Sequence, residues 1–147
     1  MRLSGGRRGI TDIWRPEGRR METTVSPAPN AVDVRILRIE GDASDCSREV
    51  GRLEPLLESL LATDLRYLVV DLAGLTGIGC VALSKLMCAV IMLRGMGGDM
   101  VLAAAGEQTL ETLRRYGVDR MVHTYASVDA AVVAVHGPIS VGDAERL

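Results

Sequence analysis

The stretch from Leu68 to Met96 constrains the fold of this chain more than any other. It begins as an apolar, β-branched run of the kind found in buried strands, which Asp71 ends. A glycine-rich turn is expected over residues 73–79, and an apolar pattern with helical spacing then runs from Cys80 to about Leu93. A strand, a tight turn and a helix in this order are typical of α/β proteins. Such turns expose backbone N–H groups to an anion or a partner.

The segment before this unit predicts a further strand and helix. The strand is expected over residues 32–39, with a bulge near Leu37, where the alternation of apolar and polar residues shifts. In the turn that follows, Ser44 or Asp45 is expected to cap the next helix. That helix contains Pro55, which predicts either a kink or a restart of the helix with Pro55 in its first turn.

The C-terminal half continues the alternation of strands and helices. A short helix is expected over residues 107–115, followed by Gly117 at a position that needs a positive φ. Ser127 is expected to cap the last helix. The other expected elements are strands over residues 100–105 and 121–125 and a helix over residues 128–135. This order predicts one α/β domain with a mostly parallel sheet.

The two ends of the chain lack this periodicity. Residues 1–30 are rich in glycine and proline and are predicted to be a disordered arm. Residues 138–147 are predicted to be a flexible polar tail, which leaves residues 31–137 as the domain. The arm holds six arginines, so contact with nucleic acid or a membrane is the alternative interpretation. The sequence from Met21 also reads like an ordinary translation start.

The composition excludes several classes of protein. With 147 residues and 48% hydrophobic content, the chain is long enough for one domain with a sizeable core. A net charge of −2 argues against a nucleic-acid binder held by bulk charge. Three cysteines are too few for a disulfide scaffold, and no apolar run is long enough for a membrane span or a secretory signal. These features predict a cytoplasmic protein.

The sequence offers no arrangement typical of an enzyme or a cofactor site. His123 and His136 have no cysteine or carboxylate at ligand spacing, so no metal is expected, and no P-loop sequence occurs. Cys80 and His123 could pair as nucleophile and base, but no local signature supports this. Asp71, at a strand end, is expected to accept hydrogen bonds from the following turn rather than to act in catalysis.

The helix that begins at Cys80 is expected to expose an unusual surface. Its sheet-facing positions are expected to be Leu83, Leu86, Val90 and Leu93. The other side then carries Val81, Ser84, Lys85, Cys88 and Met92. Valine, cysteine and methionine around one lysine indicate a partner site rather than a solvated face. Cys80 itself is interpreted either as a small, half-buried apolar residue or as a thiol whose pKa the helix start lowers, and which is open to oxidation.

The segment YLVVDLAGLTGIGCVALSKL resembles the central motif of STAS domains, the fold of bacterial anti-sigma factor antagonists. The turn at Gly41 and Asp42, residues 117–120 and the final helix opened by Ser127 also resemble the family, so that the resemblance covers about residues 32–136. It implies a small STAS-type α/β fold, with helices packed on a mostly parallel sheet, and no enzymatic activity. It also implies a protein partner, an anti-sigma factor that is often a serine kinase. In that family, phosphorylation of a serine at the start of the central helix releases the complex.

This sequence departs from the STAS motif at the decisive place. Position by position, the resemblance puts the family's aspartate at Gly79, its phosphoacceptor serine at Cys80 and its glycine at Ala82. Because cysteine is not a substrate of a serine kinase, Cys80 is a degenerate phosphoacceptor position. Ser84 lies one turn deeper in the helix, and Thr76 lies in the turn but outside the motif.

The leading interpretation is a non-enzymatic regulatory module that binds an anti-sigma factor and lacks the usual phosphorylation switch. Two alternatives stay open. One is a redox sensor that reports through Cys80, and the other is a STAS accessory subunit of a transport or lipid-trafficking complex. The expected partner-binding residues are Asp42, Ser44, Gly79, Cys80, Val81, Ser84, Lys85 and Met92.

Overall fold

A computed structural model describes residues 20–137. Within this range a six-stranded sheet has the order β1-β2-β3-β5-β6, and β4 pairs with β2 away from this path. Strand β1 is antiparallel to β2, and the other pairs are parallel. The strands are β1 Glu22–Ala28, β2 Ala31–Ala43, β3 Tyr67–Asp71, β4 Leu75–Ile78, β5 Asp99–Ala103 and β6 Thr124–Tyr125. The predicted α/β fold with a mostly parallel sheet is confirmed.

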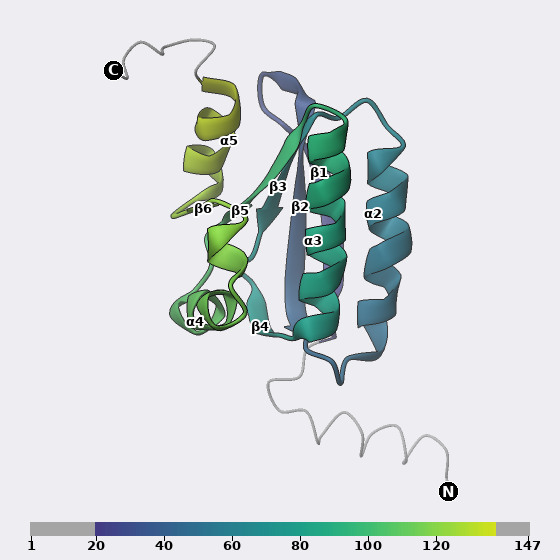
Figure 1. Cartoon of the computed structure of the whole chain (residues 1–147), viewed down its shortest axis with the longest axis vertical. Coiled ribbons are helices and arrows are strands. Elements are labelled where there is room, and N and C mark those ends of the chain that lie inside the picture. Colours follow the sequence, from purple (N-terminus) through teal and green to yellow (C-terminus); the bar gives the residue numbers. More distant parts are fainter. Residues whose placement is uncertain (1–19, 138–147) are drawn as a thin grey trace, which may run out of the picture.

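Helices cover both faces of the sheet (Figure 1). Helices α2 and α3 lie side by side on one face, α5 packs against β3 and β5 on the other, and α4 lies beside β4. The carboxyl ends of β2, β3 and β5 meet at the edge of the sheet where α3 and α4 begin. The helices are η1 Arg48–Arg52 and η2 Val118–Arg120, both 3-10, and α2 Leu53–Leu61, α3 Cys80–Gly95, α4 Glu107–Arg115 and α5 Val128–Gly137. None of the helices described here is long and apolar enough to cross a membrane.

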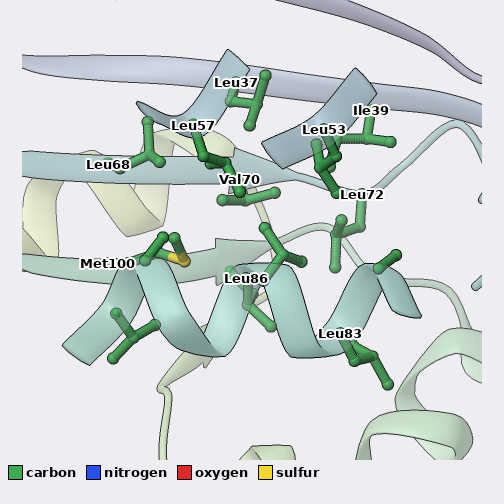
Figure 2. Packing of buried hydrophobic residues seen from close by; sticks show 14 of the residues in the cluster. Leu37, Ile39, Leu53, Leu57, Leu68, Val70, Leu72, Leu83, Leu86 and Met100 are labelled. Atoms are coloured by element: carbon green, nitrogen blue, oxygen red, sulfur yellow. The ribbon is translucent and has the colours of Figure 1, made fainter. Parts of the chain in front are cut away.

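Two hydrophobic clusters hold the helices on the sheet. Successive residues of β3 point to opposite faces, so Leu68 and Val70 join the cluster with α2 and α3, whereas Val69 joins the cluster with α5. Figure 2 shows the larger cluster, in which leucines of both helices meet the strands. The inward face predicted for α3 is confirmed, since its residues are all buried: Leu83, Leu86, Val90 and Leu93.

Strand β1 shows that the predicted N-terminal arm is wrong over residues 20–30. This strand pairs along the edge of β2, and Met21, just before it, is only 5% exposed. The strand is hard to read from sequence because most of its side chains are polar and exposed and it contains Pro27. An edge strand tolerates proline because one of its sides forms no ladder hydrogen bonds. The predictions for residues 1–19 and 138–147 lie outside the described residues.

The turn predicted over residues 73–79 contains a strand instead. Strand β4 pairs with the end of β2, which continues through Gly41 and Asp42, so the turn predicted at these two residues is also wrong. The irregularity in β2 falls between Gly41 and Asp42, whereas the pairing of β2 with β3 is regular around Leu37. Because β4 is short and only half-buried, its residues read as a turn in the sequence.

The helix boundaries confirm two predictions and correct a third. Pro55 lies in the first turn of α2, which restarts after the 3-10 helix η1. Gly117 has a φ of +74°, as expected after α4. The predicted cap is wrong, because Ser47, and not Ser44 or Asp45, accepts the backbone hydrogen bond (3.3 Å) at the start of η1.

Candidate partner-binding site

The start of α3 is capped by a side chain from a distant loop. Gly79 is at the N-cap position, with an extended backbone and no side chain that could cap the helix. Instead, the N–H of Val81 donates to Oδ1 of Asp45 over 2.9 Å. The N–H of Gly79 donates to the carbonyl oxygen of Ala43 over 3.1 Å, which ties the same two segments together. Asp45 therefore places a negative charge where the helix dipole favours one.

The same contact explains the glycine at position 79. A Cβ on Gly79 would lie 2.5 Å from Oδ1 of Asp45 and 2.8 Å from the backbone nitrogen of Asp45. These distances are shorter than atoms tolerate without displacement, so any side chain at position 79 would push the loop away. The aspartate that the STAS motif has at this position is incompatible with Asp45 where it lies.

Cys80 is exposed in the first turn of α3 and contacts a residue that the sequence did not predict. The hydroxyl of Tyr116 donates a hydrogen bond to the Cys80 sulfur, and this bond is the main cause that raises the pKa of Tyr116. The charges of Cys80 and Asp45 raise that pKa further, while Arg115 lowers it. Tyr116 follows α4, and nothing in the sequence links that position to the start of α3.

A groove of 160 Å³ lies between α2 and α3. It is lined by Ser84, Lys85 and Met92, which were predicted as partner-binding residues, and by Cys88. The Nζ of Lys85 lies 2.7 Å from Oε1 of Glu54 on α2, so the lysine is paired across the groove. The structure thus brings these predicted residues together on one surface, and it adds Glu54.

Asp42 and Ser44 lie on the other side of the helix start. The N–H of Ser44 donates to Oδ1 of the half-buried Asp42 over 2.9 Å. Ser44 lines a larger cleft, of 570 Å³, between β4 and α4, which sequence reasoning missed. The predicted site residues therefore fall on two neighbouring surfaces. Asp45 connects these surfaces, because it directly follows Ser44 in the chain and its Oδ1 accepts the hydrogen bond from the N–H of Val81.

Among the described residues, neither a metal site nor the pair of Cys80 and His123 has a supporting arrangement of side chains. Between residues 20 and 137 no group of three His, Cys, Asp or Glu side chains could hold a metal ion. The two residues of the proposed nucleophile–base pair have other neighbours. Cys80 is hydrogen-bonded to Tyr116, whereas the ring of His123 lies near that of Tyr125, with 6.4 Å between the centroids. Asp71 accepts a hydrogen bond from the N–H of Ala73 over 3.0 Å, which confirms the structural role predicted for it.

These elements define a small α/β domain that exposes the outer side of α3 and the loops beside the start of that helix. The chain belongs to the STAS domain family, which matches residues 27–131. The resemblance seen in the sequence is therefore confirmed. None of the curated proteins compared with the chain matches it.

Solved structures share this fold. An anti-sigma factor antagonist from Mycobacterium paratuberculosis superposes with a TM-score of 0.70 at 23% identity, over 79% of this chain and 94% of that one. The unphosphorylated anti-sigma factor antagonist SpoIIAA gives 0.68 at 10% identity, over 83% and 100%. A sulfate transporter family protein from Wolinella succinogenes gives 0.64 at 15% identity, over 76% and 91%. At these identities the similarity establishes the fold alone.

Proposed function

We propose that this protein is a regulatory binding module of the anti-sigma factor antagonist type whose binding is not switched by phosphorylation at the start of α3. Its partner is an anti-sigma factor, of the serine-kinase type or a relative of it, so the protein acts in the cytoplasm. The observation that carries the proposal is the start of α3. Cys80 stands at the acceptor position, and Asp45 fills the space that a side chain on Gly79 would need.

The outer side of α3 supports a docking surface. Apolar side chains normally turn away from solvent, yet Met92 is 52% exposed and its neighbour Ile91 is 62% exposed. Val81 and Met96 continue the exposed apolar residues toward the two ends of the helix. Exposed apolar side chains that follow one element mark a surface that a protein partner covers. Ile91 was not among the predicted residues, although it lies seven positions after Ser84 and so on the same side of the helix.

The chemistry at residue 80 supports the missing switch. A serine kinase positions a hydroxyl oxygen for in-line attack on a phosphoryl group. Cys80 offers sulfur in place of oxygen at the acceptor position. The hydroxyls of Thr76 and Ser84 are exposed nearby. Both lie outside the motif, so the test must examine them directly.

Cys80 also supports a second candidate function, that of a thiol redox sensor. The residue is exposed, and its side chain hydrogen-bonds with that of Tyr116. Reaction with a peroxide would convert the thiol to a sulfenic acid. Thiol labelling against pH distinguishes this candidate, because a sensor cysteine reacts as a thiolate near neutral pH. The transport alternative has the shared fold alone in its favour.

Calorimetric titration with serine-kinase-type anti-sigma factors from the same organism tests the docking surface. We expect one of them to bind, and we expect Val81→Asp combined with Met92→Asp to abolish binding while the protein stays folded. Val133→Asp is the matched control, since Val133 is an exposed valine on α5, across the sheet. If the double variant binds as well as the wild type, α3 is not the docking surface.

A further inference from the structure

The cleft between β4 and α4 is separate from the outer side of α3. Its volume of 570 Å³ falls inside the range of roughly 300–1,000 Å³ that small-molecule sites occupy. One wall is β4, which includes Thr76, together with Ser44 just after β2, and the other is one side of α4 from Glu107 to Arg115. Figure 1 shows these two elements next to each other at the end of the sheet.

The start of α4 lacks a side-chain cap. Gly106 is at the N-cap position and makes no side-chain hydrogen bond, although its carbonyl oxygen accepts the first helical bond, from Leu110, over 2.8 Å. The backbone N–H groups of the first helical turn therefore have no intrahelical partner. Gly106 and the first turn of α4 line the cleft, so the positive end of this nine-residue helix faces it.

Thr109 is the observation that points to a ligand. It lines the cleft, is only 7% exposed, and its hydroxyl has no hydrogen-bond partner among the residues that the structure describes. Burial of a hydroxyl without a partner costs stability, so native proteins normally satisfy such groups. Thr112, one turn later in the same wall, shows the contrast, because its hydroxyl donates to the carbonyl oxygen of Gln108 over 3.1 Å.

The charges of the cleft define the ligand class. Arg115 lines it and offers a guanidinium group to an oxyanion, whereas Glu107 and Glu111 on the same wall disfavour a polyanion. A ligand carboxylate at the start of α4 would accept hydrogen bonds from the helix N–H groups and the Thr109 hydroxyl, while Arg115, the last residue of α4, adds a positive charge to the same cleft. Hydroxyl or ammonium groups on the same molecule would donate to the glutamates. We propose that this cleft binds a small carboxylate that carries hydroxyl or ammonium groups.

Calorimetry and backbone amide NMR of the whole protein test this site. The probes are gluconate and L-serine, with inorganic phosphate and glycerol for comparison. We expect saturable binding of at least one carboxylate probe, with the largest amide shifts at Glu107, Gln108 and Thr109, and weaker binding of phosphate and glycerol. Absence of saturable binding, or shifts confined to another surface, would overturn the proposal.

Two threonines in one wall give a matched pair of variants. Thr109→Val removes the unpartnered hydroxyl at nearly constant volume and is expected to weaken binding about tenfold, whereas Thr109→Ser should restore it. Thr112→Val removes a hydroxyl that already has a partner, so its effect should be under about threefold. Equal losses for Thr109→Val and Thr112→Val would contradict the assignment. Failure of this site would leave the docking surface on α3 untouched, because the outer side of that helix has no part in the cleft.

Discussion

The carboxylate of Asp45 lies 2.9 Å from the backbone nitrogen of Val81, which is 36 positions later in the chain, and it caps the helix that begins there. In most helices the N-cap residue itself supplies the capping oxygen. Here the cap position is Gly79, and the oxygen comes from the loop after β2. The loop after β2 and the start of α3 are therefore held together.

Removal of this cap should cost stability. Asp45→Ala is expected to lower the free energy of unfolding by about 0.5–2 kcal/mol, the range for a lost N-cap side chain. Asp45→Asn should cost less, because its amide oxygen still accepts the hydrogen bond. Urea denaturation measures both. Asp64→Ala, at an exposed aspartate, serves as the control and should stay within about 0.5 kcal/mol of the wild type.

The contact at position 79 gives a steric prediction. Gly79→Ala places a Cβ against Asp45, so it should destabilise the protein by about 1–3 kcal/mol, as overpacking does. Gly95→Ala, at the other end of α3, meets no atom within 4 Å and should leave stability unchanged or slightly raised. Equal effects of the two alanines in thermal unfolding would show that Asp45 does not occupy the space beside Gly79.

Strand β1 should be necessary for a stable domain. A chain that starts at Ala31 lacks β1, exposes the edge of β2 and loses the buried Met21. We expect it to lose more than about 1 kcal/mol of stability, since burial of one such side chain contributes about 1.5–3 kcal/mol. A chain that starts at Arg20 retains the strand and is the control. Stability that is equal in these two shortened chains would contradict the role of β1.

The pair formed by Cys80 and Tyr116 predicts a shift in a titration. The hydrogen bond to the sulfur and the nearby negative charges favour the neutral phenol, so they hold the pKa of Tyr116 above its usual value of 10.0. Cys80→Ala should lower that pKa, and Cys46→Ala, at another exposed cysteine, should not. Ultraviolet absorbance against pH measures the change, with Tyr116→Phe to identify the signal. An unchanged midpoint in Cys80→Ala would mean that the two side chains do not interact in solution.

Local patterns in the sequence predicted the elements with strong periodicity. The inward leucines of α3, the restart at Pro55 and the positive φ of Gly117 each depend on neighbouring residues, and each is confirmed. Strands β1 and β4 could not be predicted in this way. One is a polar edge strand and the other is a short, half-buried one, so neither shows the apolar alternation of a buried strand.

The candidate site was predictable only where a single helix defines it. Ser84, Lys85 and Met92 share a groove because helical spacing puts them on one side of α3. Asp45 and Tyr116 come to the start of the same helix from other elements. Thr109 becomes a candidate binding residue only because β4 packs beside α4 and forms the cleft. Such relationships depend on tertiary packing, which spacing along one chain does not encode.

The test of the missing phosphorylation switch is the most direct test of the proposed function. A serine-kinase-type anti-sigma factor that binds the protein is incubated with it in the presence of ATP and Mg²⁺. We then measure the intact mass of the protein and its affinity for the partner by calorimetry. We predict no phosphate on the protein and an unchanged affinity, because Cys80 offers no hydroxyl at the acceptor position. A phosphate on Thr76, Ser84 or any other residue, together with loss of binding, would contradict the proposal.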